Sequence, residues 1–152
     1  MKAVIQRVTR ASVTVDKEIT GEINKGLLVL LGVMQGDTQA EMKLLAKKVS
    51  EIRIFEDENE KMNLSIRDVD GEILVVSQFT LCADLSRGRR PSFINSAKPD
   101  EANELYEAFC EELRTIGVKK VATGIFAADM AVELVNDGPV TIIMDTDDWK
   151  KG

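Results

Sequence analysis

A short polar stretch, residues 77–84, holds the side chains of this chain that are best suited to chemistry. It follows directly on residues 72–76, an apolar run typical of a strand buried on both faces. Polar groups at the end of a rigid strand commonly form sites, although small polar residues there are also ordinary turn formers. Two hydroxyls, an amide and an aromatic ring come from the candidate catalytic residues Ser77, Gln78, Phe79 and Thr80.

The chain has no histidine, and its two cysteines are Cys82 and Cys110. Without an imidazole there is no Ser-His or Cys-His pair to activate a nucleophile, and no histidine ligand for a metal. Thr80 is the one obvious nucleophile, but no partner base can be named for its hydroxyl, which favours a positioning role over attack. The two isolated cysteines do not match the ligand spacing of a zinc site. We therefore expect no metal and no cofactor.

The balance of charge bears on nucleic-acid binding. The chain has 26 acidic and 20 basic residues, a formal net charge of −6 at pH 7. This balance argues against indiscriminate binding to phosphates, which needs clustered Lys and Arg. A local basic patch is still compatible with it, and Arg87, Arg89 and Arg90 form one directly after the polar stretch. These three arginines either contact RNA or are solvated loop residues.

Short strands and two helices must position these residues. Thr38 and Glu41 have the spacing of a capping box that starts one helix. The second helix begins at Pro99 and stops at Gly117. Apolar or alternating runs predict strands at 2–8, 12–15, 19–23, 27–33, 52–55, 119–123, 130–135 and 140–144.

Two turn signals join strands, and the end of the chain is polar. Asp70-Gly71 predicts a hairpin between residues 64–66 and residues 73–76. Asn136-Asp137-Gly138-Pro139 predicts a second turn that leads into the last strand. The polar tail from residue 145 to residue 152, apart from Trp149, is expected to fray.

The 152 residues contain no repeat or linker and are predicted to form one domain, residues 1–152. Many short strands with two helices, mostly hairpin-connected, indicate an α+β fold with a largely antiparallel sheet. The longest apolar run, residues 27–33, is far short of the roughly 20 residues that cross a bilayer, so we expect no membrane association. The N-terminus lacks the layout of a signal peptide, and a cytoplasmic location follows by default.

Three stretches of the sequence, taken together, resemble the D-aminoacyl-tRNA deacylase family, also described as D-tyrosyl-tRNA deacylases. The most specific are Ser77-Gln78-Phe79-Thr80-Leu81 and Asn136-Asp137-Gly138-Pro139, and the opening residues 1–8 also match. Met62-Asn63-Leu64-Ser65 and Arg90-Pro91-Ser92-Phe93 look like the family as well. The resemblance runs from Met1 to about Asp145.

The resemblance implies a barrel-like sheet with two main helices packed outside it, and a homodimer. The implied function is hydrolysis of the ester bond of D-aminoacyl-tRNA at its 3′ acceptor end, including glycyl-tRNA mischarged on tRNA-Ala, with release of free tRNA and D-amino acid. The 2′-hydroxyl of the terminal adenosine would assist catalysis. Gly138-Pro139 would form a cis peptide that enters the partner subunit's pocket and rejects L-aminoacyl-tRNA. Sequence alone would predict a trans bond.

Two weaker site assignments and two other function classes stay open. Phe126 and Met130 line the pocket or belong to the core. The chain could instead be a non-catalytic β-domain that binds aminoacyl-tRNA or another nucleic acid, or a Thr/Ser-type esterase. The acidic charge argues against the first class, and the lack of histidine against the second.

Overall fold

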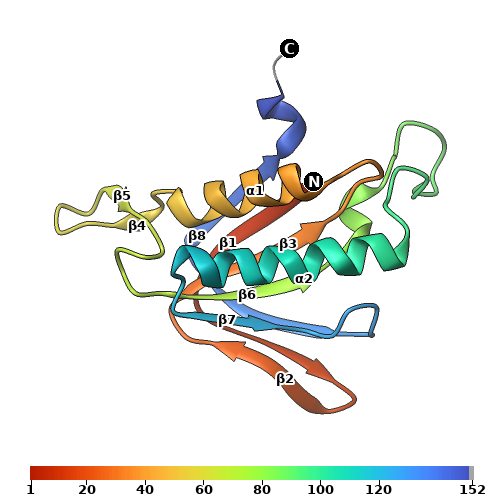
Figure 1. Cartoon of the computed structure of the whole chain (residues 1–152). Helices are drawn as coiled ribbons and strands as arrows, with labels where there is room; N and C mark the ends of the chain where they lie inside the picture. The colour runs from red at the N-terminus through yellow and green to blue at the C-terminus, as the bar shows by residue number, and fades with distance from the viewer. Residues whose placement is uncertain (151–152) are drawn as a thin grey trace.

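The computed structural model describes residues 1–150, in which two long helices cross one face of a strongly twisted sheet (Figure 1). The helices are α1 (Gln39–Glu51) and α2 (Pro99–Ile116), and two single 3-10 turns are η1 (Phe79–Cys82) and η2 (Thr146–Trp149). The strands are β1 (Lys2–Val15), β2 (Glu18–Ile23), β3 (Gly26–Gly32), β4 (Phe55–Glu56), β5 (Met62–Leu64), β6 (Glu72–Ser77), β7 (Lys120–Thr123) and β8 (Ala131–Asp145).

The long strand β1 organises the sheet. Its first half pairs antiparallel with β3 and its second half with β2, while β8 runs antiparallel along nearly its whole length. Strand β6 lies parallel between β3 and β7. At the open side of the sheet, β2 approaches β7 so closely that a Cβ atom added to Gly21 would overlap the carbonyl oxygen of Thr123. The sheet is therefore mostly antiparallel and nearly closed, and the predicted fold class is confirmed.

Two hydrophobic cores lie on the two faces of the sheet. Ile73 and Val75 of β6 belong to the outer core, between the sheet and the helices. Leu74 and Val76 belong to the inner core, inside the curled sheet. Successive side chains of a strand point to opposite faces, so a strand with a core on each side is apolar throughout. This explains the continuous apolar run that precedes the polar stretch.

Both helices begin where the sequence predicts, and the second also ends there. The Thr38 hydroxyl accepts a hydrogen bond from the Ala40 amide, and the Glu41 carboxylate accepts one from the Thr38 amide, which completes the capping box. Helix α2 starts at Pro99 and ends at Gly117, whose φ of 115° suits glycine. No helix within residues 1–150 has the length and apolar character required to cross a membrane.

Four local predictions are wrong. The strand expected at 52–55 is only the short β4, which begins at Phe55. Residues 62–64 pair with β4, and β6 pairs in parallel with its neighbours, so the Asp70-Gly71 turn joins no hairpin. Residues 136–139 form no turn either, because β8 continues through them against β1. The tail does not fray up to residue 149, since Thr146 is fully buried and η2 is ordered; residues 151–152 lie outside the described part.

Candidate active site

A cavity of about 780 Å³ lies at the end of β6. Residues 76–80, at the end of β6 and the start of η1, line one part of the cavity, and residues 126–130 line another. Residues from Phe93 to the start of α2 close a third side. A concave, mainly apolar space with a few converging polar groups is the usual form of a ligand site. All four candidate catalytic residues line it.

The position of the 3-10 turn η1 is fixed by its contacts with β3. The Gln78 amide donates to the carbonyl of Leu31 at 2.8 Å, which extends the parallel pairing of β6 by one bond. A Cβ on Gly32 would lie 3.0 Å from Leu81 Cβ and 3.2 Å from Cys82 Sγ. Glycine at position 32 therefore lets η1 pack directly on β3, and the polar side chains emerge from a rigid strand end.

The polar side chains of the candidate catalytic residues are available to a ligand. Ser77 and Gln78 are half-buried and Thr80 is exposed. Within residues 1–150, none of these three side chains makes a hydrogen bond to another protein group. Phe79 is 57% exposed and meets the ring of Phe93 edge-on, with 4.9 Å between centroids. The site therefore offers hydroxyl and amide groups beside an aromatic wall.

Cys82 has a structural role beside the candidate site. Its thiol is buried and donates from Sγ to the carbonyl of Val33 at 3.4 Å. Burial raises the pKa of this thiol above its ordinary value of 9.0. A neutral, hydrogen-bonded thiol is a poor nucleophile.

Phe126 and Met130 both line the cavity, and both also pack against the cores. The Phe126 ring lies 6.0 Å from that of Tyr106, whose hydroxyl donates to the carbonyl of Val75 at 3.3 Å. The two readings made from the sequence, pocket and core, therefore apply together. Residues 126–130 form a wall that the core holds in place.

Gly138 and Pro139 lie in a bulge of β8. Opposite them, Gln6 pairs with Thr141 and Val8 with Asn136, so one residue of β1 faces four residues of β8. The peptide bond between Gly138 and Pro139 is cis, as the family resemblance implies. Both residues are exposed, and neither lines the cavity of its own chain. The structure thus places this motif apart from the four candidate catalytic residues.

Arg7 holds this bulge, and the sequence reasoning missed it. Its side chain is buried and donates from Nε to the Asp137 carbonyl at 3.0 Å and from Nη1 to the Ile54 carbonyl at 2.7 Å. The carboxylates of Glu56 and Asp137 lie 3.8 and 3.7 Å from the guanidinium. The sequence contained one signal for this role, an arginine among the apolar residues of an inner strand. A charge buried there needs partners.

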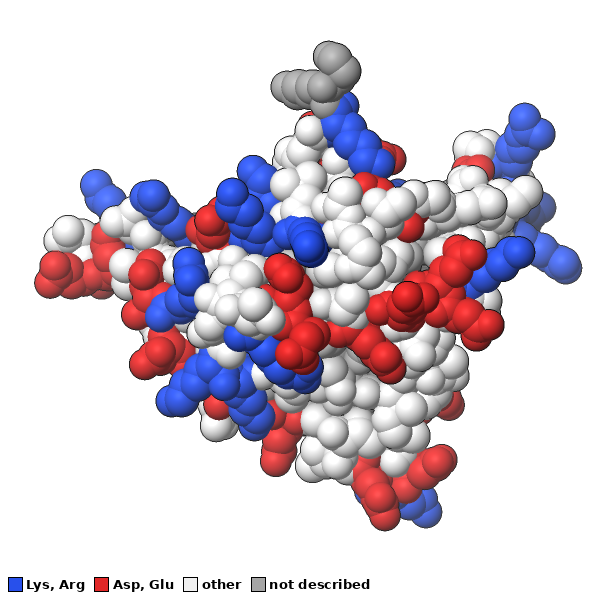
Figure 2. All heavy atoms as spheres, viewed as in Figure 1, with Lys and Arg blue, Asp and Glu red and all other residues white. Residues whose placement is uncertain are grey.

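Arg87, Arg89 and Arg90 are exposed in the loop that follows η1 and do not line the cavity. Backbone hydrogen bonds of 2.7 and 3.0 Å between Asp84 and Ser92 close this loop at its base. Figure 2 shows basic side chains on this loop, at the right of the view, and acidic side chains along α2. On this part of the face, the basic loop lies apart from the acidic side chains of α2.

Across residues 1–150, no three side chains of the His, Cys, Asp and Glu types gather as metal ligands would. In the acidic loop at residues 56–60, the Asp57 carboxylate instead accepts hydrogen bonds from the backbone amides of Asn59 and Lys61. These bonds lower the pKa of Asp57 below its ordinary value.

Comparisons with known proteins agree on one family. The family model described as D-Tyr-tRNA(Tyr) deacylase matches residues 4–145. A D-aminoacyl-tRNA deacylase of Koribacter versatilis is 58% identical over 146 residues, which are 96% of this chain and 97% of that protein. A D-aminoacyl-tRNA deacylase of Clostridioides difficile is 56% identical over the same shares of the two chains.

Two solved structures have the same fold. One, titled c-Myc DNA Unwinding Element Binding Protein, has a TM-score of 0.91 and 44% identity, and covers 95% of this chain and 98% of that one. The other, titled a probable eukaryotic D-amino acid tRNA deacylase, has a TM-score of 0.79 over 94% of this chain and 97% of that one; at 16% identity it supports the fold alone. On the sequence matches, the chain belongs to the D-Tyr-tRNA(Tyr) deacylase family, a family of hydrolases that act on ester bonds.

Proposed function

We propose that this protein hydrolyses the ester bond of D-aminoacyl-tRNA and releases free tRNA and a D-amino acid. The observation that carries the proposal is the cavity at the end of β6. There the side chains of Ser77, Gln78 and Thr80, which make no hydrogen bond within residues 1–150, present polar groups beside Phe79. Family membership supplies the substrate class. The single domain spans residues 1–152 and acts in the cytoplasm, where charged tRNA is found.

In the proposed reaction the protein positions the ester and does not attack it. Water adds to the ester carbonyl, the bond to the ribose 3′ oxygen breaks, and that oxygen takes up a proton. Backbone and side-chain donors at residues 77–80 stabilise the negative charge that develops on the carbonyl oxygen. The 2′-hydroxyl of the terminal adenosine assists the proton transfer. Two facts support this scheme: the sequence has no histidine, and no side chain within residues 1–150 hydrogen-bonds to the Thr80 hydroxyl.

The proposal includes a cross-subunit device for chirality. In it the protein is a homodimer, and the Gly138-Pro139 bulge of one subunit enters the cavity of the other. Its backbone faces the α-carbon of the substrate, so an L-side chain clashes while a D-side chain or glycine fits. Glycyl-tRNA mischarged on tRNA-Ala is then also a substrate. The support is positional: the motif is exposed, is held by a buried arginine, and does not line the cavity of its own chain.

A contact with tRNA is the remaining part of the proposal. Arg87, Arg89 and Arg90 bind phosphates near the acceptor end, where guanidinium groups suit phosphate oxygens. Their loop is exposed beside the cavity, whereas acidic side chains line α2 (Figure 2). This segregation favours an approach of the tRNA from the side of the loop.

Purified protein incubated with D-tyrosyl-tRNA tests the activity. We expect free D-tyrosine and intact tRNA to appear, while a simple aryl ester without tRNA is left untouched. Binding of the charged tRNA without turnover would favour the non-catalytic binding domain. Rapid cleavage of the simple ester would favour the general esterase.

Mixing two inactive variants tests the cross-subunit device. Gly138→Ala damages only the bulge and Gln78→Ala only the cavity, so each homodimer should be inactive. After the two are unfolded and refolded together, a mixed dimer regains one intact site if the bulge acts across the interface. Mixtures as inactive as the parents, or a fully active monomer in sedimentation, would contradict the device.

A further inference from the structure

We propose that Asp37, paired with the α-amino group of Met1, is a positioning residue that fixes the walls of the candidate active-site cavity. Asp37 does not line the cavity and so acts through the residues it holds. The kinetic part of the test rests on the proposed deacylase function. The structural part is independent of it.

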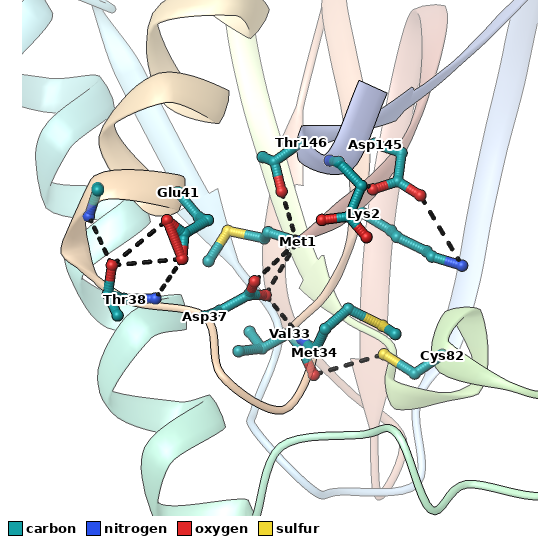
Figure 3. Close-up of polar contacts among 12 residues, drawn as sticks. Met1, Lys2, Val33, Met34, Asp37, Thr38, Glu41, Cys82, Asp145 and Thr146 are labelled. Carbon is teal, nitrogen blue, oxygen red and sulfur yellow. Dashed lines mark hydrogen bonds and ion pairs between the residues drawn. The ribbon is translucent and has the colours of Figure 1, made fainter. Parts of the chain in front are cut away.

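The pair is a buried salt bridge between the first residue and the turn after β3. The Met1 nitrogen lies 2.9 Å from Asp37 Oδ2 and donates a hydrogen bond to Oδ1 at 3.0 Å. It also donates to Thr146 Oγ1 at 2.8 Å, so three segments meet at one ammonium group (Figure 3). The side chains of Met1 and Asp37 are 0% and 4% exposed. Removal of one partner would leave the other charge buried and unpaired, which is strongly unfavourable.

The same carboxylate closes the turn that follows β3. Asp37 Oδ2 accepts a hydrogen bond from the Met34 amide at 2.7 Å, and the Asp37 amide donates to the Met34 carbonyl at 3.1 Å. Figure 3 shows Asp37 between the amino group of Met1 on one side and the backbone of Met34 on the other. The position of residues 33–37 is therefore tied to the ion pair.

This turn holds two walls of the cavity. The carbonyl of Val33 accepts from the Ala97 amide at 3.0 Å and from Cys82 Sγ at 3.4 Å. The Gln35 amide donates to the carbonyl of Asn95 at 2.7 Å. Cys82 ends the 3-10 turn that carries Phe79 and Thr80, and Ala97 lines the cavity. A shift of the turn would therefore move both η1 and residues 93–97.

The size of the expected effect follows from the geometry of catalysis. Displacement of a positioned group by about 1 Å can lower a rate by about a hundredfold, even when the substitution is remote. Asp37→Asn keeps the shape of the side chain and removes its charge, so the amide faces an unpaired ammonium. A Gly-Ser extension before Met1 instead replaces the ammonium by a neutral peptide group. Both changes should loosen the same turn.

The test compares these two changes, their combination, and the milder Thr146→Val with a matched control. Ile66→Ala is the control, because Ile66 is fully buried in the outer core and does not line the cavity. It should lower Tm without touching the turn. The first readout is amide hydrogen exchange of residues 78–82 and 93–97 in the protein alone. The second is kcat and KM on D-tyrosyl-tRNA, well below each Tm.

We expect Asp37→Asn to speed exchange in both segments and to lower kcat by about tenfold or more, with KM within about twofold. Ile66→Ala, at a similar loss of Tm, should change neither the exchange rates nor kcat. The extension combined with Asp37→Asn should add little to the effect of Asp37→Asn alone, because both changes break the same interaction. Exchange and kcat that match the control would overturn the proposal; if Asp37→Asn does not fold, the extension and Thr146→Val decide it on the same readouts. A wild type without deacylase activity would overturn the proposed function alone, and the exchange rates would still decide the role of Asp37.

Discussion

The guanidinium of Arg7 donates a hydrogen bond to the backbone carbonyl of Asp137 at 3.0 Å. A buried side chain of β1 thus holds the exposed bulge of β8 that carries Gly138 and Pro139. The contact is to a carbonyl oxygen, so it fixes the backbone of the bulge directly. The second guanidinium bond, to Ile54, anchors Arg7 in turn.

Arg7→Met should destabilise the protein and disturb the bulge. Two carbonyls lose their donor, and a buried acceptor left unpaired costs about 1–3 kcal/mol, so we expect a loss of about 2 kcal/mol in the free energy of unfolding. Arg10→Met is the matched control on the same strand. Arg10 forms an exposed ion pair with Glu133 at 3.1 Å, worth at most about 1 kcal/mol. Equal losses in urea unfolding would contradict the anchoring role of Arg7.

Gly138→Ala tests the bulge itself. Gly138 has a φ of 136°, and an added Cβ would lie 2.8 Å from Val140 Cγ2 and 3.0 Å from the Val140 nitrogen. Gly117→Ala is the matched control, because its φ of 115° carries similar strain with only open space around it out to 3.9 Å. The strain common to both costs about 1–2 kcal/mol. We expect activity on D-tyrosyl-tRNA to be lost in Gly138→Ala and kept in Gly117→Ala, in an assay at matched concentrations of folded protein.

The sequence predicted the elements better than it predicted their pairing. Capping residues and apolar periodicity located both helices, since those signals are local. The Asp70-Gly71 turn misled, because the partners of β6 are set by an inner and an outer core that only the folded sheet creates. Likewise Asn136–Pro139 has the composition of a turn, yet β1 pairs on both sides of it and makes it a bulge.

The candidate site was predictable only where its residues are consecutive in the sequence. Ser77, Gln78, Phe79 and Thr80 follow a strand end, and the structure brings all four into the lining of one cavity. Arg7 and Asp37 were missed because their contacts are distant in the sequence. Arg7 binds a residue 130 positions away, and Asp37 binds one 36 positions away. Thr146 was missed for the same reason; its polar tail has no local feature that marks a buried contact with Met1.

Thr80→Ala separates positioning from attack. If Thr80 positions the ester, the variant should slow deacylation by less than about tenfold. Replacement of the terminal 2′-hydroxyl by hydrogen should slow it by about a hundredfold or more, in the range of general acid–base contributions. Single-turnover rates on the two tRNAs measure both effects. The opposite ranking, or an acyl group found on Thr80 by mass spectrometry, would establish attack by Thr80.

Because the thiols are buried, we expect the folded protein to lose stability at alkaline pH. Burial raises the pKa of Cys110 from its ordinary 9.0 to about 12. Above pH 9 the unfolded chain has therefore lost this proton while the folded chain keeps it, so the free energy of unfolding falls with pH, by up to about 1.4 kcal/mol per unit. Cys110→Ala should reduce the slope between pH 9 and pH 11 in urea unfolding. An unchanged slope would assign the alkaline loss to other groups, such as Tyr106, whose pKa burial also raises.

We propose that a cavity beside β6, completed by the Gly138-Pro139 bulge of a second subunit, selects substrates by the configuration of the α-carbon. Initial rates of deacylation of D-tyrosyl-, L-tyrosyl- and glycyl-tRNA by the wild-type protein test it most directly. A backbone wall senses only whether an L-side chain is present, so we expect D-tyrosyl- and glycyl-tRNA to be hydrolysed and L-tyrosyl-tRNA to be spared. Equal rates on the D- and L-tyrosyl substrates, or hydrolysis of D-tyrosyl-tRNA with glycyl-tRNA spared, would contradict it.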